Sequence, residues 1–260
     1  MARRRFFVDR VEDGRAEISG DDAHHLTRVL RVEVGQQYEI TDTHRVWLAT
    51  IDAARKNLVQ FSVVEELEAA ASLPQVTLYL ALIKFDRFEW AVEKATELGV
   101  TGIVPVSAAR SDPGLSQGAK KRAERWRRIA KEASEQSRRA RAPEIADPLP
   151  FAQAIRQPST HRIWLDENDR TKPLMQAFTL TPGDSSALMV GPEGGWSDSE
   201  RVAFAQAGWI GASLGPCVLR AETAVCAVLA IFAQLAMASA TGEPDSKAPG
   251  PFTIEAADAV

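Results

Sequence analysis

The sequence of 260 residues contains very little cysteine, with Cys217 and Cys226 as its two thiols. Two cysteines cannot form the network of disulfides that holds small secreted domains together. Neither cysteine lies in a metal-ligand pattern. We therefore expect two reduced thiols in a cytoplasmic protein that binds no metal ion.

Long apolar runs are also missing. No run reaches the roughly 18 residues of a membrane-spanning helix. The longest, residues 224–238, is rich in alanine and is interrupted by Gln234, so it predicts a buried core helix. No apolar segment follows the basic residues at the N-terminus, which argues against a secretory signal. We expect no membrane association.

Several common catalytic motifs are absent. The glycine-rich segment 191–197 lacks the Lys-Ser/Thr pair of a phosphate-binding P-loop, and no G-x-G-x-x-G follows a strand. There is no G-x-S-x-G, and no histidine pair has zinc spacing. His24 and His25 are adjacent and would point in different directions on a helix, which favours a structural role.

The overall charge is mildly acidic, but its distribution is uneven. The net charge is −4, and 25% charged with 45% hydrophobic residues is ordinary for a soluble protein of one or two domains. Residues 120–141 nevertheless hold ten lysines and arginines against three glutamates. Phosphate binding depends on local charge, so this segment predicts an RNA-binding helix; a solvated surface helix is the alternative.

Residues 1–70 have the pattern of a small β-barrel. Short apolar runs alternate with glycine and asparagine turn signals. One short helix is expected after Gly20, capped by Asp21 or Asp22. Residues 65–72 are polar and alanine-rich, which predicts a linker. The expected strands are Arg5–Val8, Ala16–Ile18, Tyr38–Thr41, Val46–Ile51 and Leu58–Val64.

Residues 73–240 alternate strand and helix patterns, which indicates an α/β domain with a mainly parallel sheet. Asp86 with Glu89, and Ser197 with Glu200, have capping-box spacing at two helix starts. Residues 241–260 have little periodicity and predict a disordered tail. The expected strands are 76–83, 100–106, 162–165, 186–190 and 210–214, and the helices 86–98, 120–139, 197–207 and 222–238.

Three segments follow the carboxyl ends of expected strands: 166–168, 191–196 and 215–220. Ligands of open α/β sheets bind at these ends. Gly191, Gly194 and Gly195 would let a ligand approach the backbone. These residues alone predict a nucleotide or cofactor pocket near a phosphate-binding surface.

Two longer segments make the prediction specific. Residues 188–200, containing Gly-Pro-Glu-Gly-Gly, and residues 213–224, containing Leu-Arg-x-Glu-Thr-Ala, resemble the two hallmarks of the bacterial 16S ribosomal RNA uridine-N3-methyltransferases of the SPOUT class. Trp196 stands where phenylalanine is commoner in that family, and Cys217 where arginine is common. Further similar segments are 4–7, 24–31, 84–89, 94–100, 135–139 and 143–145.

The resemblance implies a fold, a donor and partners. It implies a PUA-like or OB-like β-barrel over residues 1–70 and a SPOUT methyltransferase domain over 73–240, whose mainly parallel sheet ends in a trefoil knot. It implies S-adenosylmethionine as methyl donor without a metal, 16S ribosomal RNA of the small subunit as substrate, and a homodimer. Val225, Leu229 and Phe232 would serve either the dimer contact or the core of one chain.

The resemblance also suggests residue roles. Arg139 and Arg220 would stabilise charge on the uracil oxygens or hold a phosphate, and Glu193 would accept a proton or orient the base. The alternatives are that Glu193 caps backbone N–H groups and that Arg220 pairs with Glu222. The expected cofactor-binding residues are Leu165, Val190, Gly191, Pro192, Gly195, Leu214, Gly215, Val218 and Leu219. The expected RNA-binding residues are Arg4, Arg5, Arg31, Arg127, Lys131 and Arg138.

Two other functions fit the same residues. One is a SPOUT methyltransferase with another target, such as transfer RNA or a ribose 2′-hydroxyl. The other is a non-enzymatic RNA-binding protein of ribosome assembly, which would need no cofactor pocket.

Overall fold

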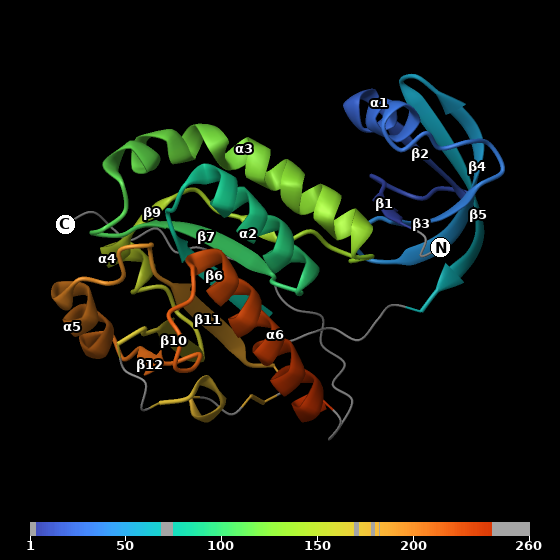
Figure 1. Ribbon diagram of the computed structural model, residues 1–260. Helices are drawn as coiled ribbons and strands as arrows, with labels where there is room; N and C mark the ends of the chain where they lie inside the picture. Colours follow the sequence, from blue (N-terminus) through green and yellow to red (C-terminus); the bar gives the residue numbers. More distant parts are fainter. Residues whose placement is uncertain (1–3, 69–74, 169–171, 178–179, 182, 241–260) are drawn as a thin grey trace. The chain divides into compact units, whose positions relative to one another are not determined.

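The chain divides into two units. The computed structural model describes residues 4–68, 75–168, 172–177, 180–181 and 183–240 (Figure 1). By its internal contacts, the first unit holds residues 1–71 with 132–142, and the second holds 72–131 with 143–260. The return of residues 132–142 to the first unit was not predicted. The expected tail, 241–260, lies outside the described residues.

The first unit is a curled five-stranded sheet that packs against one helix (Figure 1). The strand order is β1-β3-β4-β5-β2; β1 and β3 are parallel and the other neighbours antiparallel. Apolar side chains such as Phe6, Ile40 and Phe61 fill its core with Leu26 of the helix. The elements are β1 (Arg5–Phe7), β2 (Arg15–Ser19), α1 (Gly20–Arg28), β3 (Gln37–Thr41), β4 (Val46–Arg55) and β5 (Leu58–Leu67).

Two details of this unit differ from the sequence prediction. Strand β5 continues to Leu67, into the expected linker, because it pairs with the long strand β4 as far as Val46. Helix α1 begins at Gly20, so Asp21 and Asp22 fall in its first turn instead of capping it. Their negative charges still favour the positive end of the helix dipole.

The second unit contains the predicted parallel sheet. Its order is β12-β10-β11-β6-β7-β8, with β9 also paired to β7, and every pair is parallel. The strands are β6 (Gln75–Ala81), β7 (Gly102–Ser107), β8 (Glu144–Ile145), β9 (Leu149–Pro150), β10 (His161–Leu165), β11 (Ser185–Val190) and β12 (Ile210–Ala212). The two-residue strands β8 and β9 are too short to leave a periodic signal and were not predicted.

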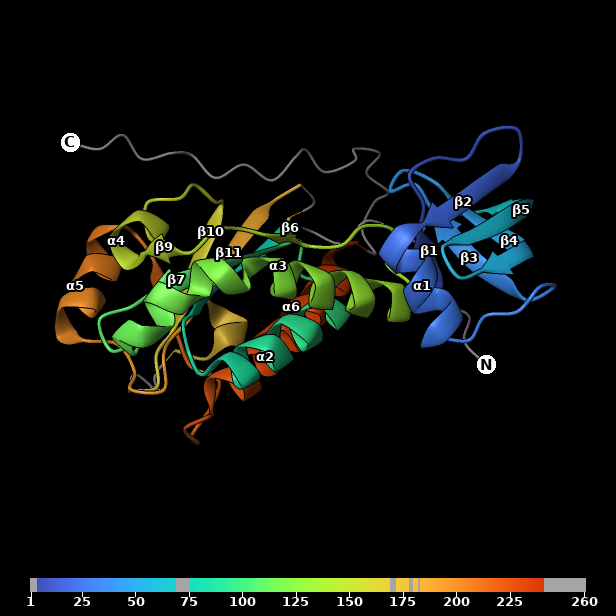
Figure 2. The same ribbon diagram turned by 90° about the horizontal axis from the view of Figure 1, so that it is seen from above.

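Helices cover both faces of this sheet (Figures 1 and 2). On one face, Phe88, Trp126 and Val228 belong to α2 (Phe85–Glu97), α3 (Pro113–Gln136) and α6 (Ala221–Ala240), and they share one core. On the other face, Ala154 and Phe204 of α4 (Phe151–Ala154) and α5 (Asp198–Gln206) share a second core. A short 3₁₀ helix, η1 (Leu174–Gln176), precedes β11.

The helix starts test the capping predictions. The capping box of α5 is confirmed: Ser197 accepts from the Glu200 N–H, and the Glu200 carboxylate accepts from the Ser197 N–H. The box at Asp86 is wrong, because α2 begins at Phe85 and Glu89 binds Arg125 at 2.7 and 2.8 Å. Helix α3 begins at Pro113, where proline's missing N–H costs nothing.

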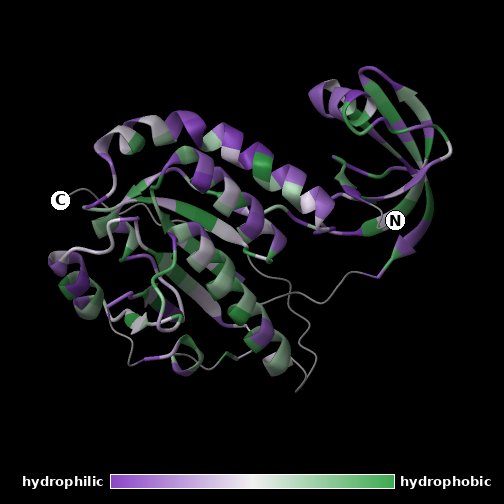
Figure 3. Cartoon of the chain, in the orientation of Figure 1, coloured by the Kyte–Doolittle hydropathy of each residue, from purple (hydrophilic) through white to green (hydrophobic). Residues whose placement is uncertain are grey.

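Helix α6 is apolar on most sides (Figure 3). Its mean hydropathy of 1.8 over Ala221–Ser239 would suffice for a membrane span by length and composition, contrary to our expectation. Val225, Leu229 and Phe232 are nevertheless buried in the core, and the helix packs against α2 and β11. The prediction of a core helix is therefore confirmed for this face, while Ala230 and Met237 lie exposed.

Candidate functional site

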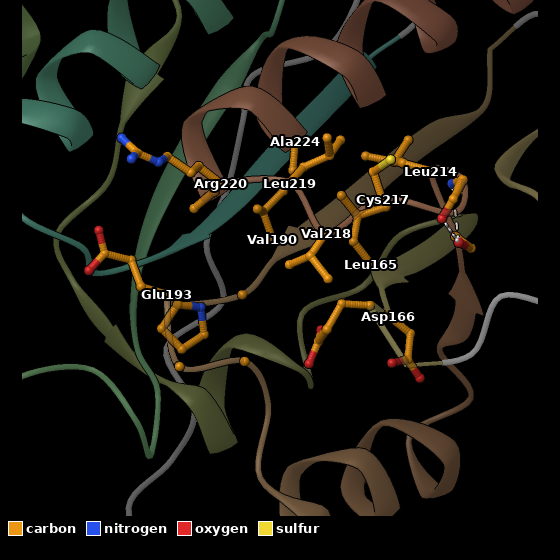
Figure 4. A pocket seen from close by; sticks show the side chains of 18 of the residues that line it. Leu165, Asp166, Val190, Glu193, Leu214, Cys217, Val218, Leu219, Arg220 and Ala224 are labelled. Atoms are coloured by element: carbon orange, nitrogen blue, oxygen red, sulfur yellow. Dashed lines mark hydrogen bonds between the residues drawn. The ribbon is translucent and has the colours of Figure 1, made fainter.

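A cavity of about 470 Å³ lies where β10, β11 and β12 end (Figure 4). Its size is within the range of small-molecule sites. The loops after these three strands build it, together with the start of α6 and Arg87 of α2. All nine residues expected to bind cofactor line it, as do Glu193 and Arg220. Their binding roles stay predictions, but the sequence did identify the residues that come together here.

The loop after β11 is packed closely by the protein's own side chains. A Cβ atom on Gly191 would lie 2.9 Å from the Trp196 Nε1, and one on Gly195 would collide with the Glu167 Oε1. Gly195 also has a φ of +68°, which side chains rarely adopt. Gly191 and Gly195 therefore make room for Trp196 and Glu167, a reason that the sequence alone did not suggest.

The packing around position 196 accounts for a tryptophan where phenylalanine is commoner in the similar family. The Trp196 side chain is buried, and its Nε1 donates a hydrogen bond of 3.1 Å to the Leu165 carbonyl. Phe151 and Phe204 contact the indole ring. The bond joins the β11 loop to the end of β10, so it fixes two walls of the cavity relative to each other.

The loop after β12 is open by comparison. Gly215 has a φ of +126°, and nothing lies within 4 Å of where its Cβ would be. The Ser213 hydroxyl accepts from the Gly215 N–H and donates to its carbonyl, both at 3.2 Å. Cys217 and Val218 are exposed while lining the cavity. This loop therefore offers backbone groups and apolar surface that a ligand would cover.

Charged side chains occupy two sides of the cavity, with Val190, Val218 and Leu165 between them (Figure 4). Asp166 and Glu167 lie on one side, and Arg201 of α5 pairs with both. The guanidinium of Arg201 also lies 5.4 Å from the centre of the Trp164 ring. Because one arginine holds two carboxylates, this side keeps a net negative charge.

Glu193 and Arg220 lie on the opposite side (Figure 4). Glu193 forms a salt bridge with Arg87, whose Nε is also 3.9 Å from the Glu222 Oε1. Among the described residues, neither alternative from the sequence is seen: Glu193 pairs with the side chain of Arg87, and Arg220 does not pair with Glu222. Arg87 lies in one of the similar segments, but the sequence did not predict that it belongs to the cavity. It is 106 positions away from its partner Glu193.

The other predicted residues belong elsewhere. Arg139 is in the first unit and does not line the cavity; burial lowers its pKa to about 10, so it stays cationic at neutral pH. Arg5 is buried and donates two hydrogen bonds to Glu39, which also pairs with Arg138. Arg5 is thus paired inside the first unit, and its expected RNA contact stays a prediction.

The remaining basic residues lie nearer the surface. Arg31 is exposed with a φ of +52°, and Arg4 is partly exposed. Arg127 is exposed and reaches the Ile145 carbonyl and Asp147 at 3.2 and 3.4 Å. Basic side chains thus remain accessible on both units. Within the described residues, no group of three or more histidine, cysteine, aspartate or glutamate side chains is arranged to hold a metal ion.

Comparisons with known proteins place the chain in a family. An RNA methyltransferase domain family matches residues 71–233, and an RNA methyltransferase PUA domain family matches residues 18–64. The ribosomal RNA small subunit methyltransferase E of Bacillus subtilis is 33% identical, over 80% of this chain and 85% of that protein. The protein of the same name from Mycobacterium tuberculosis is 31% identical, over 86% and 88%.

Solved structures agree. The methyltransferase E of Neisseria gonorrhoeae, bound to S-adenosyl methionine, matches with a TM-score of 0.80 at 27% identity, over 90% of this chain and 98% of that one. A putative methyltransferase of Legionella pneumophila, in complex with the same cofactor, matches with a TM-score of 0.81 at 28% identity, over 89% and 97%. The chain therefore belongs to the ribosomal RNA small subunit methyltransferase E family, with a PUA domain preceding an RNA methyltransferase domain.

Proposed function

We propose that this protein transfers a methyl group from S-adenosylmethionine to N3 of a uridine in 16S ribosomal RNA of the small subunit. The observation that carries the proposal is the cavity at the three strand ends, in which an apolar wall separates two charged sides. Membership of the family favours an enzyme over a non-enzymatic RNA-binding protein.

The residues present fit this donor. Leu165, Val190 and Leu219 offer apolar surface for an adenine ring, and Gly215 exposes backbone groups. The excess negative charge of Asp166 and Glu167 over Arg201 suits a donor whose sulfonium and ammonium outweigh its single carboxylate. When bound, S-adenosylmethionine supplies a methyl group on positively charged sulfur, which needs no metal for its transfer.

The protein's own task is to prepare the acceptor. Uridine N3 carries a proton and is a weak nucleophile until that proton leaves. Arg220, exposed at the cavity, stabilises the negative charge that then develops on the uracil oxygens. Glu193, on the same side, accepts the proton or orients the base. Both groups act by being held where charge changes during the reaction.

Basic residues outside the cavity would bind the RNA backbone. We assign Arg4, Arg31, Arg127, Lys131 and Arg138 to phosphate contacts, which increase affinity without reading sequence. Arg139 would hold an RNA phosphate; burial lowers its pKa to about 10, and it is still cationic at neutral pH. The PUA domain family match over residues 18–64 supports an RNA-binding role for the first unit.

A trefoil knot and a homodimer complete the proposal. Residues 172–174 lie beside Ser213: the Ser213 N–H donates to the Lys172 carbonyl, and the Leu174 N–H donates to the Ser213 carbonyl. We place the passage of the chain through its own loop at this contact.

The dimer contact would use exposed apolar side chains on two helices that pack together. Trp90 of α2 is 44% exposed and Met237 of α6 is 57% exposed, and both suit burial against a second copy of the chain. The substitution Ala230→Glu should then yield monomers in sedimentation; an unchanged dimer would contradict this assignment.

Nucleoside analysis tests the proposed reaction. Small-subunit particles lacking the modification are incubated with the protein and S-adenosylmethionine, and their digested 16S ribosomal RNA is examined by mass spectrometry. We expect 3-methyluridine, formed in the cytoplasm where ribosomes are assembled. A methyl group on ribose, or on transfer RNA instead, would assign the chain a different target.

A further inference from the structure

Arg87 connects two carboxylates on different segments: Glu193, which lines the cavity, and Glu222, which does not. Its Nη1 forms a salt bridge with the Glu193 Oε1, in the loop after β11. Its Nε lies 3.9 Å from the Glu222 Oε1, in the first turn of α6. Arg87 itself belongs to α2, so three elements that are separate in sequence meet at one guanidinium.

The Arg87 guanidinium compensates the negative charge of a Glu222 carboxylate that is largely buried. The Glu222 side chain is 14% exposed, and among the described residues its buried Oε2 has no hydrogen-bond partner. A buried carboxylate without compensation is costly, and a second carboxylate nearby increases the cost. Removing the Arg87 charge would therefore leave Glu193 and Glu222 to repel each other and would free the Glu193 side chain.

Arg220 differs from Arg87 although both line the cavity. Arg220 is exposed, and within the described residues no carboxylate lies in salt-bridge distance of it. Arg87 is only 29% exposed and its charge is already engaged. The two arginines therefore have different roles: Arg220 is available to bind a substrate, whereas Arg87 binds the Glu193 carboxylate.

We propose that Arg87 is a positioning residue for methyl transfer, which holds the Glu193 carboxylate in the lining of the cavity and ties it to the start of α6. This inference rests on the proposed function, because it assigns Arg87 a role through Glu193. It predicts an effect on turnover more than on binding of the methyl donor.

Four variants test the role: Arg87→Gln, Arg87→Lys, Glu193→Gln and the double variant of Arg87→Gln with Glu193→Gln. We expect Arg87→Gln to lower kcat about 100-fold at saturating RNA and donor, as misplaced groups do. The Kd of S-adenosylmethionine, measured by calorimetry, should change less than about threefold. Arg87→Lys should recover part of kcat, since it keeps one charge. The double variant should be no slower than Glu193→Gln alone.

The matched control is Arg125→Gln, which removes another arginine–glutamate pair, between Arg125 of α3 and Glu89 of α2, and does not touch the cavity. It should keep wild-type kcat. Thermal unfolding shows whether each variant folds; if Arg87→Gln does not, Arg87→Lys carries the test by its intermediate kcat.

Three results would overturn the role of Arg87 while the wild type stays active: an unchanged kcat, a loss confined to donor affinity, or multiplying losses in the double variant. An inactive wild type would instead overturn the proposed function.

Discussion

The two glycine-containing loops of the cavity are alike in sequence character and different in structure. In the loop after β11, the space beside Gly191 and Gly195 is filled by Trp196 and Glu167. In the loop after β12, the space beside Gly215 is empty, and Val218 is 71% exposed. The first loop is thus shaped by the folded chain, and the second would be completed by a ligand. Glycine content alone does not distinguish these roles.

The largest effects are expected at the charged residues that the β11 and β12 loops bring to the same side. Arg220→Ala should lower kcat by about 10²- to 10³-fold, the usual cost of removing a group that stabilises developing charge. Glu193→Gln should cost a similar factor if its carboxylate takes the proton. Single-turnover methyl transfer to small-subunit particles measures both. Full activity in folded forms of both variants would remove them from the mechanism.

Gly195→Ala should affect the packed loop more than Gly215→Ala affects the open one. Both glycines have positive φ, so both substitutions incur backbone strain of about 1–2 kcal/mol. Only at Gly195 does the new methyl group also displace Glu167 from Arg201. Urea unfolding and donor binding by calorimetry should show the larger loss for Gly195→Ala. Equal losses would mean that the packing around Gly195 is unimportant.

Gly191→Ala and Trp196→Phe should compensate each other in part. A methyl group on Gly191 meets the indole Nε1, which phenylalanine lacks. Trp196→Phe alone loses the hydrogen bond to Leu165, at about 1 kcal/mol. The double variant should therefore lose less free energy of unfolding than the two single variants lose together. Additive losses would indicate that the indole does not restrict Gly191.

The smallest effect on the cavity should come from changes outside both loops. Changing Arg127, Lys131 and Arg138 together to glutamine should weaken RNA binding and flatten its salt dependence by about three charges, while donor affinity stays unchanged. Arg122→Gln and Arg125→Gln, which break pairs with Glu89, provide the control. An unchanged salt slope in the triple variant would exclude Arg127, Lys131 and Arg138 from the RNA interface.

The sequence predicted those parts of the fold that depend on neighbouring residues. Ser197 and Glu200 cap α5 because three positions suffice for the two hydrogen bonds. The same spacing at Asp86 failed, because Glu89 binds Arg125 on another helix. The loops of the cavity were predictable because each directly follows a strand of one parallel sheet.

Contacts between distant segments could not be predicted from the chain's pattern. Arg87 and Glu193 are 106 positions apart, and Trp196 reaches Leu165 across 31. The sequence suggested that Arg5 is a surface cation, whereas the structure shows it buried and paired with Glu39. Such pairs depend on the tertiary fold, and here they determine which charged residues are free to bind a substrate.

Calorimetric titration of the wild-type protein with S-adenosylmethionine tests the central claim most directly, since both loops must bind one ligand together. We predict one donor molecule bound per chain, and binding that is weakened when Val218, the exposed apolar residue of the open loop, is changed to aspartate. Absence of binding to the folded wild type, or equal binding by Val218→Asp, would contradict the account of this cavity.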